Sequence, residues 1–104
     1  MANAIVVRYR TTPEAADENA QLVRDVYAEL AASQPAAFRY MTLQLDDGVS
    51  FLHVAVHDEA AENPLTTSEA FARFQSGIAD RLEQGPEPSP ATVVGAYGFG
   101  AGKG

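Results

Sequence analysis

The sequence contains no cysteine and no tryptophan, and it has only 7 Lys and Arg residues against 14 Asp and Glu. Without cysteine the chain cannot form disulfides, thiolate nucleophiles, iron–sulfur clusters or Cys-ligated zinc sites. The formal net charge of -7 repels phosphate backbones and anionic headgroups, so we expect neither nucleic acid nor a membrane surface as a partner. No run approaches the roughly 18 apolar residues of a membrane span, and the first residues lack a basic signal region. A cytoplasmic protein is therefore the default expectation.

The residues that are present suit one folded domain. The chain has 104 residues, of which 46% are hydrophobic and 9% aromatic, and this composition argues against intrinsic disorder. The length is sufficient for a single core and too short for two domains. We expect residues 1–99 to form one α+β domain and the glycine-rich residues 100–104 to form a flexible tail.

The first half of the sequence predicts a strand, a helix and a hairpin. Residues 5–10 are β-branched and aromatic, and they lead into a helix over residues 13–33 that begins at Pro13. The inward stripe of this helix recurs at helical spacing and comprises Ala16, Asn19, Ala20, Val23, Val26, Tyr27 and Leu30. Residues 38–45 and 49–58 predict two strands, because Asp46-Asp47-Gly48 between them is a hairpin turn sequence.

The second half predicts another helix and a last strand. Thr66 and Glu69 have capping-box spacing, and four apolar residues then share one helical face: Phe71, Phe74, Ile78 and Leu82. The proline-rich residues 85–90 predict a stiff loop, and residues 91–99 predict a strand. The resulting β-α-β-β-α-β order predicts a ferredoxin-like fold, with an antiparallel sheet in the order 4-1-3-2 and both helices on one face.

Alternation along the strands divides the hairpin into two faces. We assign the aliphatic set to the helix-covered core: Met41, Leu43, Leu45, Leu52, Val54 and Val56. The aromatic and polar set is then expected on the outer face: Phe38, Tyr40, Thr42, Gln44, Phe51, His53, Ala55 and His57. If Ile5, Val7 and Tyr9 face the helices, the residues that join this outer face are Val6, Arg8 and Arg10. Its aromatic content suggests that a second copy covers it, so we expect a homodimer. A small-molecule cavity is expected either between the sheet and the helices or at the dimer contact.

His53 and Arg8 are the candidate catalytic residues. A histidine at mid-strand exchanges protons near neutral pH, and an arginine beside it could stabilise a bound enolate or phenolate anion. The plainer alternatives are that His53 hydrogen-bonds across a dimer interface and that Arg8 pairs with carboxylates of the partner subunit. His53 and His57 stand roughly 13 Å apart along one strand, so they do not chelate one metal ion, and we expect no metal site.

Four further residues are candidates for binding a small hydrophobic or aromatic ligand: Tyr40, Phe51, His57 and Tyr97. Tyrosine hydroxyls could contact a quinone-like or phenolic compound, although a tyrosine on a sheet usually packs with its polar tip in water. His57 lies near the end of its strand, where a structural role fits equally well. The segment Asn63-Pro64-Leu65 is either a loop over the cavity mouth or the start of the second helix.

The element order, the length and the two-faced sheet resemble the dimeric α+β barrel superfamily. The sequence Phe-Leu-His-Val-Ala-Val-His-Asp-Glu at 51–59, followed by Phe-Ala-Arg-Phe at 71–74, is most similar to the third strand and second helix of its antibiotic-biosynthesis-monooxygenase-like branch. Members of that branch often have a Trp shortly after the third strand and a His in the second helix. Here His57 stands near the Trp position and the second helix has no His. The resemblance therefore implies the fold and the place of the cavity, and it transfers no catalytic residue.

The resemblance implies a monooxygenase-like enzyme that needs no cofactor and acts on an aromatic or polyketide-like substrate. In such a reaction the carbanion of the substrate itself activates oxygen, and the protein supplies a base, an anion-stabilising group and a dry pocket. The alternative is a non-catalytic ligand-binding or dimerisation module of the same fold, since one fold hosts many functions. An open cavity at the candidate residues would favour the enzyme.

Overall fold

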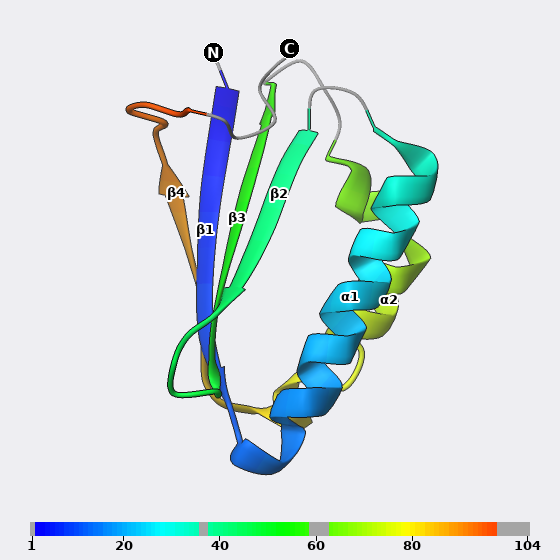
Figure 1. Ribbon diagram of the computed structural model, residues 1–104, viewed down its shortest axis with the longest axis vertical. Helices are drawn as coiled ribbons and strands as arrows, with labels where there is room; N and C mark the ends of the chain where they lie inside the picture. The colour runs from blue at the N-terminus through cyan, green and yellow to red at the C-terminus, as the bar shows by residue number, and fades with distance from the viewer. Residues whose placement is uncertain (1, 36–37, 59–62, 98–104) are drawn as a thin grey trace.

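The computed structural model describes residues 2–35, 38–58 and 63–97, which form one four-stranded antiparallel sheet with helices on one face (Figure 1). In chain order the elements are β1 (Ala2–Thr11), η1 (Pro13–Ala15), α1 (Ala16–Ser33), β2 (Phe38–Gln44), β3 (Ser50–Asp58), η2 (Pro64–Thr67), α2 (Glu69–Gln75), α3 (Ile78–Arg81) and β4 (Leu82–Ala91). The sheet order is β2-β3-β1-β4. This confirms the ferredoxin-like α+β fold and the predicted strand order. No helix in the described ranges is long and apolar enough to cross a membrane.

The predicted first helix and hairpin are confirmed, and local chemistry explains where they end. Helix α1 stops at Gln34, whose φ of 48° is left-handed and whose N–H bonds to the Leu30 carbonyl oxygen. In the hairpin turn, the Asp47 carboxylate accepts hydrogen bonds from the backbone N–H groups of Val49 and Ser50. Gly48 follows with a φ of 79°, which a residue without Cβ adopts at little cost. These contacts fix how β2 pairs with β3.

The second helical region is shorter and more broken than its periodicity predicts. The Asn63 side chain caps the 3-10 turn η2, and the Ser68 side chain accepts from the Phe71 N–H at the start of α2. Gly77, with a φ of 74°, separates α2 from α3. The carboxylate of Glu29 on α1 accepts from the Ala70 N–H, which ties the first turn of α2 to α1. Helix α2 is thereby held over the sheet as a short separate element.

The last strand was predicted wrongly. The proline-rich segment predicted as a loop is β4, and of the predicted strand 91–99 only Ala91 lies in it; residues 98–104, including the predicted tail, lie outside the described residues. Proline normally breaks a ladder because it has no N–H, but β4 pairs only with β1 at the edge of the sheet, where Pro88 lies opposite Val7. Gly85 fits at an irregularity in this pairing, because a Cβ there would lie 2.8 Å from the Arg8 carbonyl oxygen.

The two faces of the hairpin are the reverse of the prediction. The aromatic set faces the helices: Phe51 is 2% exposed and His53 is 5% exposed, and both lie beneath α1 and α2. The aliphatic residues assigned to the core, such as Leu43 at 42% exposure, line the side of the sheet away from the helices. We call this side the open face; its residues include Val6, Met41, Leu43, Val54 and Val56.

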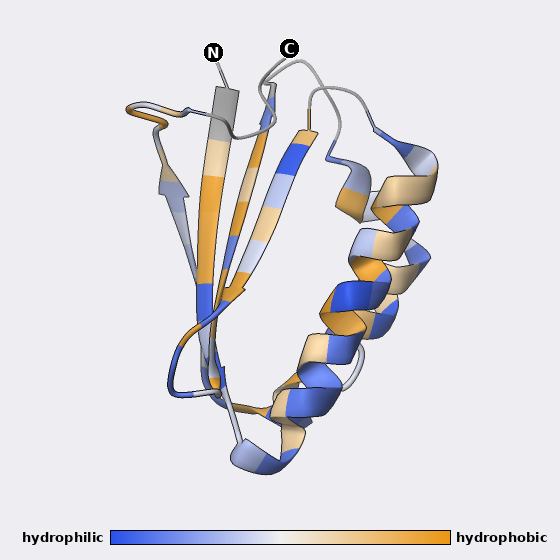
Figure 2. Ribbon diagram, viewed as in Figure 1, coloured by the Kyte–Doolittle hydropathy of each residue, from blue (hydrophilic) through white to orange (hydrophobic). Residues whose placement is uncertain are grey.

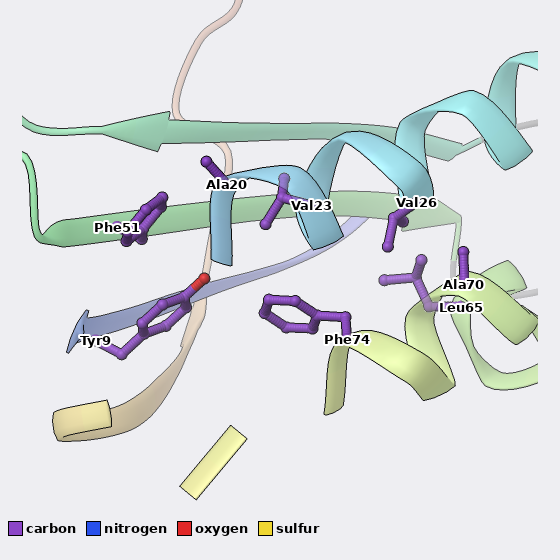
Figure 3. Close-up of a cluster of buried hydrophobic side chains, with 8 residues drawn as sticks. All are labelled: Tyr9, Ala20, Val23, Val26, Phe51, Leu65, Ala70 and Phe74. Carbon is purple, nitrogen blue, oxygen red and sulfur yellow. The ribbon is translucent and has the colours of Figure 1, made fainter. Parts of the chain in front are cut away.

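The cross-strand register explains why the aromatic set is inside. Directly opposed residues of antiparallel strands share a face, and Tyr9 lies opposite Phe51 while Val7 lies opposite His53. Tyr9 is 3% exposed and stacks on Phe51 with ring centroids 5.4 Å apart, and Phe74 of α2 points toward Tyr9 (Figure 3). The prediction that alternate residues of β1 face the helices is confirmed. Because the aromatic set of β3 lies directly opposite these residues, it faces the helices too. Hydrophobic stretches run along β1 and β3, and α1 alternates hydrophobic and hydrophilic residues (Figure 2).

Candidate functional site

A cavity of about 420 Å³ lies between the helix-facing side of the sheet and the segment from η2 to α3. Its volume is in the range of small-molecule sites. Most of its lining is apolar, and three polar side chains of the sheet converge on it: Tyr9, Tyr40 and His53. The full lining is Ile5, Val7, Tyr9, Tyr40, His53, Ala55, Asn63, Leu65, Thr66, Ser68, Phe71, Ala72, Phe74, Gln75, Ile78 and Pro86. This combination suits an aromatic ligand with one polar edge.

His53 is the centre of a buried hydrogen-bonded cluster. Its Nε2 atom lies 2.7 Å from the Tyr9 hydroxyl, and its Nδ1 atom lies 2.6 Å from the Tyr40 hydroxyl. Thr42 Oγ1 is a second neighbour of Nδ1 at 3.3 Å, and it also lies 2.8 Å from the Tyr27 hydroxyl. Both ring nitrogens therefore have partners, as a buried imidazole requires.

The cluster continues away from the cavity to a buried arginine. Asn19 of α1, which is fully buried, donates from Nδ2 to the Tyr9 hydroxyl oxygen at 2.9 Å. Arg81 donates from Nε to Asn19 Oδ1 at 3.2 Å, and its other nitrogens donate to the backbone carbonyl oxygens of Ser76 and Phe74. Arg81 is 5% exposed and its guanidinium carbon lies 5.4 Å from the centre of the Phe74 ring. Its charge is thus held by neutral acceptors and an aromatic face.

Burial sets the protonation states of this cluster. Desolvation lowers the pKa of His53 to about 4, so the imidazole is neutral at pH 7. Burial raises the pKa of Tyr9 to about 12, although the hydrogen bond from Asn19 and the charge of Arg81 act in the opposite direction. Burial also raises the pKa of Tyr40 well above its usual value. At neutral pH the cavity therefore faces a neutral imidazole and protonated phenols.

The structure brings some of the sequence candidates together and separates others. His53 and Tyr40 both line the cavity and contact each other. Phe51 lies on the same side of β3 but is a packing residue against Tyr9 and does not line the cavity. His57 lies farther along β3, opposite Phe38 of β2, and is also outside the cavity lining.

Arg8 and Tyr97 lie elsewhere. Arg8 precedes Tyr9 on β1 and is exposed on the other side of the strand, near Gln84 and Glu87 of β4. The structure therefore does not pair Arg8 with His53, because the two side chains leave opposite faces of the sheet. Tyr97 is fully exposed and stands beside the open face. The cavity at the aromatic set lies under the helices within one chain, which is one of the two places that the sequence left open.

Five cluster members were not predicted as site residues: Tyr9, Asn19, Tyr27, Thr42 and Arg81. For Asn19 the sequence held a signal, since it is a polar residue inside the inward stripe of α1. Arg81 had no comparable signal, because a charged residue in a helical segment is normally exposed. The segment Asn63-Pro64-Leu65 begins the 3-10 turn η2, and α2 starts only at Glu69. Asn63 and Leu65 of this segment line the cavity.

Comparison with known proteins identifies the fold. No protein-family model matches the sequence, and no curated protein does. Among solved structures, a candidate antibiotic biosynthesis monooxygenase from Bacteriodes thetaiotaomicron superposes with a TM-score of 0.76 at 16% identity over 89% of this chain and 90% of that one. A candidate monooxygenase of the same description from Nitrosomonas europaea superposes with a TM-score of 0.74 at 13% identity, over 95% of this chain and 94% of that one. A variant of SnoaB, a cofactor-independent oxygenase from Streptomyces nogalater, superposes with a TM-score of 0.67 at 18% identity, over 93% of this chain and 97% of that one.

Proposed function

We propose that this protein is a cofactor-independent oxygenase that binds an aromatic or polyketide-like compound in the cavity between the sheet and α2. The observation that carries the proposal is the convergence of His53 and Tyr40 on a mainly apolar cavity of about 420 Å³. We expect a planar ring system to lie against the apolar part of the lining, with a substrate oxygen atom at the Tyr40 hydroxyl. The similarity in fold to SnoaB supports the class of reaction and does not by itself establish it.

The reaction draws its electrons from the substrate. A CH₂ group next to a conjugated carbonyl loses a proton, and the resulting enolate transfers one electron to O₂. The two radicals join through a new C–O bond, and the resulting peroxide anion takes up the proton released in the first step. The hydroperoxide then loses water to leave a carbonyl group. One oxygen atom ends in the product and one in water, which also takes both hydrogen atoms of the CH₂ group. The protein accelerates this sequence by stabilising the enolate oxygen in a site from which water is excluded.

We also propose that the protein is a homodimer joined through the open face. Several aliphatic residues of this face remain exposed in the single chain, with Met41 at 37% and Leu43 at 42%, and Val94 beside them is almost wholly exposed. Exposed apolar residues gathered on one side of a sheet mark an interaction surface. A two-fold contact would cover the same patch on both copies.

The oxygenase proposal is tested by oxygen uptake with 1,8-dihydroxyanthrone, corrected for its spontaneous oxidation. We expect the wild-type protein to raise the rate of O₂ consumption and to yield the corresponding quinone. Tyr40→Phe should lower kcat by roughly 10- to 100-fold, because it removes one hydrogen-bond donor to the enolate oxygen. The measurement is oxygen-electrode kinetics together with absorbance of the product.

Tyr97→Phe is the matched comparison, since it removes the same hydroxyl from a tyrosine outside the cavity. An equal loss in both variants would contradict the assignment of Tyr40. If the protein binds the anthrone but does not raise oxygen uptake, the oxygenase proposal is rejected. The alternative of a non-catalytic ligand-binding module would then be favoured.

Leu43→Glu is expected to convert the dimer to a monomer, because it places a charge on the apolar surface of the proposed contact. Sedimentation equilibrium should give twice the chain mass for the wild type and the chain mass for the variant. Ala28→Glu adds the same charge on the exposed side of α1 and should remain dimeric. A monomeric wild-type protein would contradict the proposed assembly.

A further inference from the structure

The buried end of the cluster has only one possible hydrogen-bond direction. A guanidinium group donates hydrogen bonds and accepts none. The contact between Arg81 Nε and Asn19 Oδ1, 3.2 Å long, therefore runs from Arg81 to Asn19. Because Arg81 is 5% exposed and also donates to two backbone carbonyl oxygens at the end of α2, it cannot turn away into water.

This fixed direction passes to Tyr9 and then to His53. With Oδ1 of Asn19 facing Arg81, the amide Nδ2 faces Tyr9 and donates to its hydroxyl oxygen at 2.9 Å. The Tyr9 proton is then left for the other neighbour of that hydroxyl, His53 Nε2 at 2.7 Å. An imidazole nitrogen that accepts a hydrogen bond carries no proton. Nε2 is therefore the unprotonated ring nitrogen of His53.

The last step reaches the cavity. A neutral imidazole with an unprotonated Nε2 carries its proton on Nδ1. The low pKa of His53 keeps the ring neutral at pH 7. Nδ1 then donates to the Tyr40 oxygen at 2.6 Å, with Thr42 Oγ1 as a more distant alternative at 3.3 Å. The Tyr40 proton is not used by His53. It is available to the neighbouring Thr42 hydroxyl or to an acceptor atom of a ligand.

We propose that Arg81 and Asn19 are positioning residues that fix the direction of this hydrogen-bond chain, so that Tyr40 presents a donor to the cavity. The ligand recognised there carries a hydrogen-bond acceptor, a carbonyl or phenolate oxygen, at the edge that meets Tyr40. The statement about the ligand rests on the proposed function, whereas the direction of the chain does not. The assignment also makes Tyr40 a stabiliser of anionic oxygen, with His53 holding it in place, since Nδ1 is already protonated and cannot accept the Tyr40 proton.

The test is the tautomer of His53, read from the ¹⁵N shifts and long-range ¹H–¹⁵N couplings of histidine-labelled protein at pH 7. The chain has two histidines, so a His57→Gln variant assigns the signals. We expect the wild-type ring to be protonated on Nδ1. Asn19→Asp should reverse it to Nε2: a carboxylate at position 19 only accepts, so the Tyr9 proton turns toward it and the Tyr9 oxygen must accept from His53.

Two variants of Arg81 distinguish its effect on the direction of the hydrogen-bond chain from its effect on packing. Arg81→Lys keeps a group that only donates and should retain the Nδ1 tautomer, whereas Arg81→Met frees Asn19 to rotate and should give a mixture of tautomers. A wild-type ring protonated on Nε2 would overturn the proposal without any variant, as would an unchanged tautomer in folded Asn19→Asp. If the tautomer reverses but the protein takes up no oxygen with the anthrone, the oxygenase proposal alone is rejected.

Discussion

Phe51→Ala is expected to lower the free energy of unfolding by about 3–5 kcal/mol, the usual cost of removing a buried phenyl ring. Phe51 is 2% exposed and stacks on Tyr9, so its loss leaves a cavity that the rigid sheet cannot close. Urea unfolding followed by circular dichroism, at one fixed protein concentration, gives the change. The slope of the free energy with urea should stay constant if only the folded state is affected.

Leu43→Ala is the control, because it removes a side chain of similar size from the opposite face of the hairpin. Leu43 is 42% exposed in the single chain, so at a concentration where the protein is monomeric the expected loss is below about 1 kcal/mol. The alternation of the sequence predicted the reverse order. A larger loss for Leu43→Ala than for Phe51→Ala in the monomer would mean that the helices cover the aliphatic face.

The order of elements was enough to predict the fold, because periodicity and turn chemistry fix the kind of every element before the last strand. The turn at Asp46-Asp47-Gly48 and the stripe of α1 were sufficient for the hairpin and the helix. The last strand could not be predicted in this way. Its prolines are acceptable only because β4 pairs on one side, and the sequence does not state which strand lies at an edge.

The site was predicted only in part, because both faces of the hairpin are apolar. An aliphatic set without polar atoms is the natural choice for a core. Burying His53 and Tyr40 is costly only where they lack hydrogen-bond partners, and the sequence does not show those partners. The structure supplies those partners from β1 and α1, through contacts between residues far apart in the sequence, such as Tyr9 with His53 and Asn19 with Arg81. Alternation is a local pattern and carries no information on such pairs.

Acid is expected to weaken the fold through His53, by about 3 kcal/mol between pH 6.5 and pH 4. The pKa of this imidazole is about 4 in the folded chain and about 6.5 when the chain is unfolded. Below pH 6.5 the unfolded state therefore binds a proton that the folded state does not, and the free energy of unfolding falls. The fall ends near pH 4, where the folded state binds the proton as well. Above pH 6.5 the contribution is complete and constant.

The contribution of His53 is isolated by comparing variants, since carboxylates also titrate in this range. Urea unfolding at intervals from pH 7.5 to pH 4 should show a steeper decline for the wild type and for His57→Gln than for His53→Gln. The difference between the wild type and His53→Gln should shrink toward acid, because only the wild type must keep a neutral imidazole buried between Tyr9 and Tyr40. A difference that does not change with pH would mean that burial does not lower the pKa of His53.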